Sequence, residues 1–321
     1  MKYYIGIDQG KTNVRVGLIN EAGEELYFSK RSYDCQSYDE MFAMLISFIG
    51  EAISEKNLTV SDLAGIGIGV PSIVNRETGM VVCGLGFDAY QDRSVTDGLA
   101  AHFKCPVAAD VDTVIAAYGE LWQGAGKTCG DFALITWGTG MGAGRIRNNE
   151  VVLSGDTLFP EFGHMRVSDD DVKCFCGSTG CLNALISGPA IAGQGQQASE
   201  SEVKTQLTDL AAANDKVVTT AMVFEAADSG DAEALRIINR MTELFGRMCV
   251  NLVYADQPEK IVVVGGLSER SKVLTDIQTI LDEQCWLIKK GLASCKIEFS
   301  ELQDKAGVIG AAYMVKMREN K

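Results

Sequence analysis

The most specific chemical pattern in the sequence is a cluster of sulfur and imidazole side chains. Three cysteines lie within eight residues, and one of only two histidines lies a short way upstream. The set is His164, Cys174, Cys176 and Cys181. Three thiolates and one imidazole form a closed tetrahedral zinc site, in which the ion shapes a loop and does not activate water. Gly177 and Gly180 let the chain fold back so that the sulfurs converge. The spacing therefore predicts a structural zinc loop over residues 164–181.

A second pattern is a glycine-containing turn that follows an apolar strand near the start of the chain. It reads Asp8-Gln9-Gly10-Lys11-Thr12. Glycine permits close approach of the backbone to a ligand, and Thr12 and backbone N–H groups can donate to phosphate oxygens. Asp8 can orient metal-bound water near those phosphates. A plain hairpin turn between buried strands has the same composition, so the motif alone leaves both interpretations open.

Two further glycine turns follow strands later in the chain. Residues 137–144 read Trp-Gly-Thr-Gly-Met-Gly-Ala-Gly. This loop suits a phosphate, but it lacks the Walker Gly-Lys-Ser/Thr, and residues 145–147 continue as a strand where the dinucleotide fingerprint requires a helix. A glycine-rich β-bulge hairpin is the alternative. Gly265-Gly266 ends the apolar strand 261–264, at the strand edge where α/β proteins bind ligands.

One carboxylate, Asp110, stands at the end of a short strand, in Val107-Ala108-Ala109-Asp110-Val111-Asp112. A carboxylate at that place, facing a cleft, can act as general base toward a sugar hydroxyl. The alternative for this segment is a helix N-cap, a role that suits Asp112 in particular.

The elements that must position these residues alternate between β-branched runs and helix-like stretches, which is typical of an α/β protein. The predicted strands are Tyr3–Asp8, Asn13–Asn20, Glu25–Arg31, Leu63–Val70, Pro106–Asp110, Asp131–Thr136 and Ile261–Val264. The predicted helices are Asp39–Lys56, Asp112–Trp122, Ser229–Val253 with Asp231 as its N-cap, and Gly307–Met317. The Gln-, Ser- and Glu-rich segment Gly193–Glu202 is predicted to be a solvated loop.

Composition limits the classes of protein that can contain this pattern. The chain has 321 residues, enough for about two domains. Lys+Arg 29 against Asp+Glu 43 gives a net charge of −14, so we expect no nucleic-acid partner. No stretch approaches the ~20 apolar residues of a membrane span. An apolar strand begins at once, so we expect no signal peptide and a cytoplasmic location. The other seven cysteines, among them Cys35, Cys129 and Cys249, are predicted to be reduced core residues.

Taken together, these segments resemble the ROK family (repressors, uncharacterised frames and sugar kinases), within the actin/hexokinase/Hsp70 ATPase superfamily. The resemblance covers nearly the whole chain in the same order. Asp8–Thr12 is similar to the family's first phosphate loop, Gly138–Gly144 to its second, and Gly265-Gly266 to its adenosine-side turn. Glu161-x-Gly-His164 and the three cysteines resemble the family signature and zinc loop, and Ala306–Ala312 resembles the closing helix.

The resemblance implies a two-domain, actin-like (ribonuclease H-like) α/β fold with a cleft between the lobes. The first lobe is expected over residues 1–122, closed by a C-terminal helix over about 305–321. The second is expected over 123–304 and includes the zinc loop. A homodimer is also implied.

The activity implied by the resemblance is ATP-dependent phosphorylation of a hydroxyl on a free hexose or amino sugar, with Mg²⁺. Asp110 would be the general base, and Glu161, His164 and Asn183 would contact the sugar together with Asp110. His164 would use one ring nitrogen for zinc and offer the other to the sugar. The implied ATP-binding residues are Asp8, Gly10, Lys11, Thr12, Gly138, Thr139, Gly140, Gly142, Gly265 and Gly266.

Several positions depart from the family pattern and affect mainly the sugar contacts. Ala109 stands where the family has Asn before the expected base, and Asn183 stands where it has Glu. Lys11 replaces a small residue, and Cys83–Phe87 replaces a Pro-Asn-Leu segment. The alternative function is therefore a catalytically silent sugar sensor. It would lack a DNA-binding domain, because the first phosphate loop begins already at Asp8. A nicotinamide-dependent enzyme built on Gly138–Gly144 is a more distant possibility.

Overall fold

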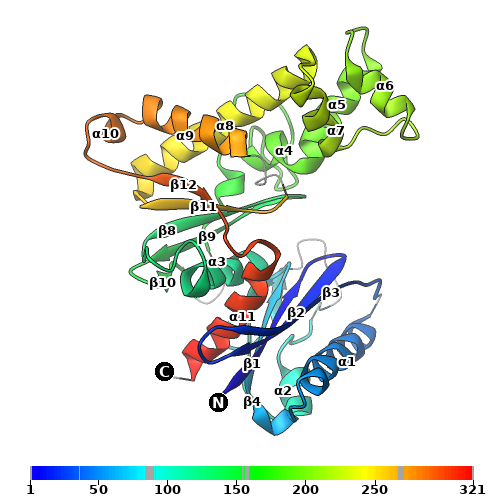
Figure 1. The fold of residues 1–321 in the computed structure, drawn as a ribbon, viewed down its shortest axis with the longest axis vertical. Coiled ribbons are helices and arrows are strands. Elements are labelled where there is room, and N and C mark those ends of the chain that lie inside the picture. Colours follow the sequence, from blue (N-terminus) through cyan, green and yellow to red (C-terminus); the bar gives the residue numbers. More distant parts are fainter. Residues whose placement is uncertain are drawn as a thin grey trace. The chain divides into compact units, whose positions relative to one another are not determined.

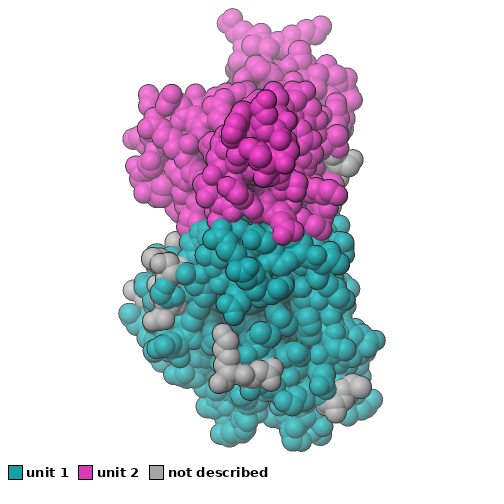
Figure 2. All heavy atoms as spheres, turned by 90° about the vertical axis from the view of Figure 1, so that its left-hand side faces the viewer, with its two compact units in different colours: residues 1–134, 144–160, 300–321 teal, residues 135–143, 161–299 magenta. Residues whose placement is uncertain are grey.

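A computed structural model describes residues 2–35, 37–83, 90, 92–153, 155, 159–266 and 271–319. The chain divides into two compact units, coloured separately in Figure 2. Unit 1 comprises residues 1–134, 144–160 and 300–321, and unit 2 comprises residues 135–143 and 161–299. Each unit therefore joins segments that are far apart in the sequence. Among the described residues, no helix has the length and apolar character that crossing a membrane requires.

Unit 1 is built on a five-stranded sheet of order β3-β2-β1-β4-β7 (Figure 1). Its strands are β1 (Tyr3–Gln9), β2 (Asn13–Asn20), β3 (Glu25–Ser32), β4 (Leu63–Val70) and β7 (Val107–Val111). The first three form an antiparallel meander, and β4 and β7 run parallel to β1. The carboxyl ends of β1, β4 and β7 therefore meet at one edge, where Asp8 and Asp110 both lie beside Gly69.

Helices cover both faces of this sheet, because successive strand side chains point to opposite faces. Ile5 and Ile7 pack into the core formed with α1 (Tyr38–Glu55) and α2 (Asp97–Phe103). Tyr4 packs on the other face with α3 (Asp112–Gln123) and α11 (Ala306–Arg318). Figure 1 shows α1 and α11 on opposite sides of the strands. The smaller elements of this unit are η1 (Val60–Asp62), β5 (Ile73–Val74), β6 (Val81–Cys83) and η3 (Gln303–Lys305).

The C-terminal helix α11 lies directly on the N-terminal strands because glycines remove side chains at the contact. A Cβ atom on Gly67 would lie 1.8 Å from the carbonyl oxygen of Ala311. A Cβ atom on Gly310 would lie 1.6 Å from the carbonyl oxygen of Ile115 in α3. Any larger residue at either position would separate the two backbones, so these glycines set how closely α11 packs.

A second five-stranded sheet has the order β10-β9-β8-β11-β12, and the division between the units falls within β8 and β9. Its strands are β8 (Phe132–Trp137), β9 (Met141–Arg147), β10 (Glu150–Val151), β11 (Lys260–Val264) and β12 (Lys296–Phe299). The helical elements of unit 2 are η2 (Phe162–His164), α4 (Leu182–Ile186), α5 (Gly188–Glu200), α6 (Gln206–Ala212), α7 (Thr220–Asp228), α8 (Ala232–Asp256), α9 (Ser271–Gln284) and α10 (Trp286–Lys289).

Most predicted elements are present within a residue or two of the expected bounds. The strand Leu63–Val70 coincides with β4, and Asp231 is the N-cap of α8 as predicted, although α8 runs three residues further, to Asp256. At the start of α3 the N-cap position belongs to Val111, and Asp112 is the first helical residue.

Two sequence predictions are wrong. Residues 193–200 of the predicted loop 193–202 belong to helix α5, which has Pro189 in its first turn and buries Ile191, Gly195 and Ala198 at helical spacing. These small residues carry little hydropathy, so the apolar pattern did not stand out. Cys83 is exposed in β6 and is not a core residue. The segment Cys83–Phe87 departs from the family pattern in the sequence. Residues 84–87 of this segment lie outside the described part of the chain.

Candidate functional site

Four side chains that can bind a metal converge in unit 2. The candidate ligand atoms of His164, Cys174, Cys176 and Cys181 all lie within 4.8 Å of one another. Cys176 Sγ is 3.8 Å from Cys181 Sγ, and His164 Nδ1 is 3.5 Å from Cys174 Sγ. Around a tetrahedral zinc ion with Zn–S of about 2.3 Å and Zn–N of about 2.0 Å, these two separations would be about 3.8 Å and about 3.5 Å. The four side chains therefore have the geometry of a closed tetrahedral metal site.

Local backbone geometry brings these ligands together. Cys174 N donates to Ser178 O (2.8 Å), which closes the turn that contains Cys176. Gly180 has φ +70°, and a Cβ atom there would lie 2.1 Å from Ser168 O. Burial, together with the neighbouring thiols of Cys176 and Cys174, raises the pKa of Cys181 to about 11. A divalent cation would reverse this effect because it stabilises coordinated thiolates.

The first predicted phosphate loop is the turn between β1 and β2, in unit 1. Gly10 N donates to Asn13 O (2.8 Å), and the Tyr33 hydroxyl donates to Gly10 O. Tyr33 N donates to Thr12 O (3.1 Å). The side chains of Lys11 and Thr12 are exposed. Tyr33 therefore holds the turn on one side, and the predicted phosphate-binding side chains face solvent.

Asp8 lies beside this turn, on the face of the sheet that α11 covers. Its carboxylate accepts a hydrogen bond from Arg15 Nη1 (3.2 Å), and Arg15 Nη2 also binds Asp304 (2.9 Å). Burial raises the pKa of Asp8, and the positive charge of Arg15 opposes that rise. A Cβ atom on Gly307 would lie 2.7 Å from Asp8 Cγ, so the first turn of α11 can approach the carboxylate only as glycine.

The second predicted phosphate loop joins β8 to β9 in unit 2. Gly138 N donates to Gly140 O (3.0 Å), while Thr139 and Gly140 are exposed. Asn183 Oδ1 accepts a hydrogen bond from Met141 N (2.8 Å). The oxygen of this predicted sugar ligand therefore bonds the backbone of the glycine turn.

The third glycine turn lies against the second. Gly265 has φ +118°, and a Cβ atom there would lie 2.4 Å from Trp137 O, directly before Gly138. Gly142 N donates to Thr136 Oγ1 (2.9 Å), so this amide supports the turn from within. Unit 2 thus brings two of the predicted nucleotide turns together with Asn183.

A sequence model of the ROK family matches residues 4–318 of the chain. The chain belongs to the ROK family. A glucokinase from Halalkalibacterium halodurans is 32% identical to it, and the match covers 99% of this chain and 96% of that protein. The crystal structure of a ROK family glucokinase from Streptomyces griseus with glucose and AMPPNP has a TM-score of 0.81 at 26% identity, and covers 98% and 99% of the two chains. A xylose repressor from Caldicellulosiruptor bescii is 26% identical, over 97% of this chain and 77% of its own length.

These similarities confirm the predicted family and the α/β fold of the actin-like ATPase type. They also assign this ROK chain to the ATP-dependent sugar kinases. The glucose and AMPPNP named above are ligands of the related glucokinase and not of this chain's structure.

Near the end of β7, the ROK chain places two carboxylates in different surroundings. Asp110 is 2% exposed, and Arg76 donates to both its oxygens, from Nε (2.7 Å) and Nη2 (2.9 Å). Val111 N also donates to Asp110 Oδ1 (2.8 Å). Burial raises the pKa of Asp110, and Arg76 acts in the opposite direction. Asp112 is only partly buried and accepts from Thr113 N (2.7 Å) in the first turn of α3.

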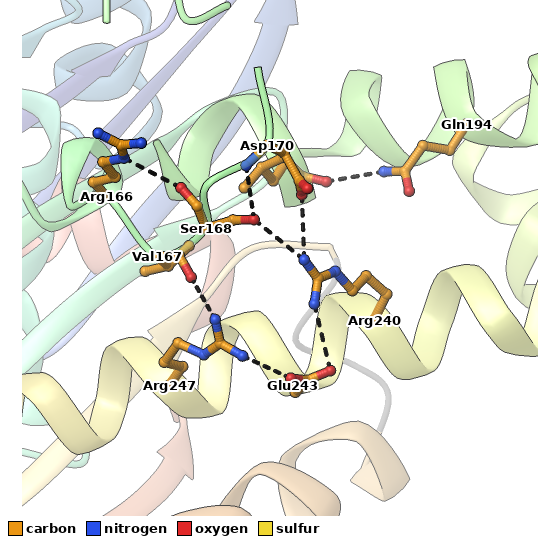
Figure 3. Close-up of polar contacts among 9 residues, drawn as sticks. Arg166, Val167, Ser168, Asp170, Gln194, Arg240, Glu243 and Arg247 are labelled. Atoms are coloured by element: carbon orange, nitrogen blue, oxygen red, sulfur yellow. Dashed lines mark hydrogen bonds and ion pairs between the residues drawn. The ribbon is translucent and has the colours of Figure 1, made fainter. Parts of the chain in front are cut away.

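The segment that follows His164 is fixed to the long helix α8 by two arginines (Figure 3). Arg247 Nη1 donates to Val167 O (2.8 Å), and Arg240 Nη2 donates to Ser168 Oγ and to Asp170 Oδ2 (both 3.2 Å). Val167 N in turn donates to Gly180 O (3.0 Å), next to Cys181. In this ROK member the loop that contains Cys174, Cys176 and Cys181 is therefore joined to α8 through residues 167–170.

His164 itself ends η2, and His164 N donates to the carbonyl of Glu161 (3.1 Å). Burial lowers the pKa of His164, which favours the neutral imidazole that a metal requires. Glu161 is exposed. The sequence reasoning did not find Arg76, Tyr33 or Gln9. Of these, only Gln9 carried a local signal, as a polar residue that continues an apolar strand into the glycine turn.

Proposed function

We propose that this protein transfers the γ-phosphoryl group of ATP to a hydroxyl of a free hexose or amino sugar. The observation that carries the proposal is the orientation of His164, whose Nδ1 faces Cys174 Sγ at 3.5 Å. With Nδ1 directed to the metal cluster, Nε2 on the other side of the ring can bond a sugar hydroxyl. The glucose and AMPPNP bound to the related S. griseus glucokinase support this pair of substrates.

The amides of Gly10, Gly138 and Gly142 bond within the protein, so these glycines would permit close approach of the phosphates. Other N–H groups of the glycine turns would donate to the phosphates in the proposed nucleotide site. Its members are Asp8, Gly10, Lys11, Thr12, Gly138, Thr139, Gly140, Gly142, Gly265 and Gly266. Phosphoryl transfer requires little covalent chemistry from the protein, and positioning and charge neutralisation dominate. Exposed turns with N–H donors suit that task. Asp8 would hold Mg²⁺ through water, and the cation would neutralise charge on the phosphates.

For the general base we propose Asp112 in preference to Asp110. Asp110 was the predicted base, but Arg76 and Val111 N already bind both of its oxygens, and its side chain is almost fully buried. A base must reach the hydroxyl whose proton it takes. Asp112 lies two residues further on, partly exposed, where the N-terminus of α3 stabilises its charge. Asp110 would then stabilise the structure around the base through its ion pair with Arg76.

The cluster of His164, Cys174, Cys176 and Cys181 is proposed to bind a structural zinc ion, which would supply rigidity to the loop and no catalytic water. Glu161 is proposed to contact sugar hydroxyls with its exposed carboxylate. Asn183 would contribute indirectly, because its oxygen holds the backbone at Met141. None of the ten cysteines, all of which lie in the described part of the chain, forms a disulfide. Free thiols are typical of a reducing compartment and accord with the cytoplasmic location that we propose. We also propose a homodimer and no nucleic-acid partner.

A coupled assay of ADP release over a panel of hexoses, hexosamines and ketoses tests the proposal. We expect turnover with at least one sugar, and its near loss in Asp112→Asn. The second candidate, a silent sugar sensor, is favoured by the similarity to the xylose repressor and by Asn183, which stands where the family has Glu. Binding of AMPPNP and a sugar without any turnover would exclude the kinase and support the sensor.

A further inference from the structure

A chain of three hydrogen bonds leads from Tyr90 to the backbone of the first glycine turn. The Tyr90 hydroxyl donates to Gln9 Oε1 (2.7 Å). Gln9 Nε2 donates to the Tyr33 hydroxyl (3.3 Å), and the Tyr33 hydroxyl donates to Gly10 O. All these residues belong to unit 1. Each donor in the chain points toward the turn, so the direction of every bond is determined.

The side chains that form these hydrogen bonds lie in the interior of the unit. Gln9 is fully buried, Tyr90 is 2% exposed, and Tyr33 is partly buried. A buried amide or hydroxyl without a partner costs about 1–3 kcal/mol, so each of these groups depends on its neighbour. Burial raises the pKa of Tyr33 and Tyr90, so both phenols stay protonated and can donate. The amide of Gln9 accepts from Tyr90 through Oε1 and donates through Nε2 to the Tyr33 hydroxyl and to Met41 Sδ (2.7 Å), which fixes its orientation.

The last bond of the chain fixes a peptide plane. Because a trans peptide is planar, the C=O of Gly10 and the N–H of Lys11 point in opposite directions. Tyr33 binds the Gly10 carbonyl, so the Lys11 N–H is directed away from Tyr33. Gly10 N is bound to Asn13 O within the hairpin. A phosphate that approaches this turn from the side away from Tyr33 therefore meets the Lys11 amide in a fixed orientation.

We propose that Tyr33, Gln9 and Tyr90 are positioning residues that orient the Gly10–Lys11 peptide toward the phosphates of the nucleotide. The inference rests on the proposed nucleotide site but not on the identity of the acceptor. Tyr33 acts directly on the peptide, and Gln9 and Tyr90 act through Tyr33. Loss of the Tyr33 hydroxyl would free the peptide to rotate, and loss of the Tyr90 hydroxyl would leave Gln9 Oε1 without that donor.

The test compares Tyr33→Phe, Tyr90→Phe and the double variant with the wild-type full-length chain. Tyr38→Phe is the matched control, because Tyr38 stacks edge-on against Tyr90 (centroids 5.9 Å apart) but donates to Ser94 O, outside the chain of bonds. The Kd of Mg·AMPPNP is measured by titration calorimetry, and KM is measured for ATP and for the sugar. One neutral hydrogen bond corresponds to about 2- to 10-fold in an equilibrium constant.

For Tyr33→Phe we expect about 3- to 10-fold weaker AMPPNP binding and a matching rise in KM for ATP, with KM for the sugar within about 2-fold. Tyr90→Phe should show a smaller change in the same direction. The double variant should be no worse than Tyr33→Phe, because both act on one peptide. Unchanged AMPPNP affinity in Tyr33→Phe, an equal loss in Tyr38→Phe, or an equal rise in both KM values would overturn the inference.

One result separates this inference from the proposed function. If the wild type binds AMPPNP and turns over no sugar, the kinase proposal fails, and the calorimetric comparison still decides the role of Tyr33. If Tyr33→Phe does not fold, Tyr90→Phe tests the same series of hydrogen bonds at the end away from the turn. A wild type that binds no nucleotide overturns both proposals.

Discussion

Arg76 binds both oxygens of the Asp110 carboxylate, with Nε at 2.7 Å and Nη2 at 2.9 Å, in the interior of unit 1. The Arg76 side chain is 9% exposed and that of Asp110 is 2% exposed. Arg318 Nη1 of α11 donates to the carbonyl of Arg76 (3.1 Å). The pair therefore ties the end of β7 to the turn after β5, and that turn to the C-terminal helix. This arrangement gives Asp110 a structural task, which is why we propose Asp112 and not Asp110 as the general base.

The first prediction concerns the two carboxylates. We expect Asp112→Asn to lower kcat by about 10²–10⁴-fold, because it removes the proposed base, while the free energy of unfolding changes little. Asp110→Asn should instead lower the free energy of unfolding, because Arg76 loses its charged partner. Steady-state kinetics and urea unfolding of both variants provide the measurements. A larger loss of kcat in Asp110→Asn than in Asp112→Asn, at equal folded fraction, would return the role of base to Asp110.

The second prediction concerns the Arg76–Asp110 pair. Removal of one member leaves a buried unpaired charge, so Arg76→Ala should destabilise unit 1 by about 3–5 kcal/mol. The double variant Arg76→Leu/Asp110→Leu should recover much of that loss, because apolar residues of similar size can replace a buried ion pair. Urea unfolding of the two singles and the double gives the comparison. Additive losses in the double variant would show that the two side chains are not coupled.

The third prediction concerns the metal. The purified wild-type protein should contain about one zinc ion per chain, as measured by elemental analysis. Cys181→Ser should lose the ion, melt at a lower temperature and raise KM for the sugar, because His164 is no longer held. KM for ATP should stay nearly constant. Cys83→Ser is the matched control, since Cys83 is exposed in unit 1 and outside the cluster, and it should keep its zinc. Equal zinc content in both variants would contradict the assignment.

Prediction from the sequence was most accurate where a single local pattern is sufficient to determine an element or a site. The apolar run Leu63–Val70 became β4 without change, and the spacing of three cysteines after His164 identified a set of residues that the fold does bring within 4.8 Å. It failed where the signal was weak, as in α5, whose buried face includes Gly195 and Ala198.

Contacts between distant segments were not predictable from the sequence. Arg76 precedes Asp110 by 34 residues, and nothing in its neighbourhood indicates that it turns toward β7. The same holds for Tyr33, whose hydroxyl returns 23 positions to Gly10. Such pairs depend on which strands become neighbours, and strand order is set by the packing of the whole unit. The choice between Asp110 and Asp112 depended on one of these contacts.

The fourth prediction concerns acid stability. Asp231 caps α8 by accepting from Glu233 N (3.1 Å) and Ala234 N (2.9 Å), and it also accepts from Gln206 N (2.7 Å). Burial alone would raise the pKa of Asp231, but these hydrogen bonds outweigh it and lower the pKa. A carboxylate with a lowered folded-state pKa stabilises the fold above its unfolded pKa, and this stabilisation is lost as the pH falls through the folded value.

Asp231→Asn should therefore lower the free energy of unfolding at pH 7 by about 1–3 kcal/mol, because the Asn amide nitrogen cannot accept the hydrogen bond from Gln206 N. The difference from the wild type should shrink as the pH falls below about 4, where the wild-type carboxyl begins to be protonated in the unfolded chain. Urea unfolding from pH 7 to pH 3 measures it. Asp228→Asn, at the end of α7, serves as a control with the same change in charge. A difference independent of pH would assign the effect to packing.

The fifth prediction uses two glycines in helices of unit 1 that differ only in their surroundings. A Cβ atom on Gly310 would lie 1.6 Å from Ile115 O, whereas a Cβ atom on Gly50 of α1 would meet nothing within 4 Å. Alanine is preferred over glycine in an open helix by about 0.5–1 kcal/mol, so Gly50→Ala should stabilise the protein by that amount. Gly310→Ala should force α11 away from α3 and destabilise unit 1 strongly. Thermal unfolding of the two variants measures both effects, and a Gly310→Ala protein as stable as the wild type would contradict the close packing of α11.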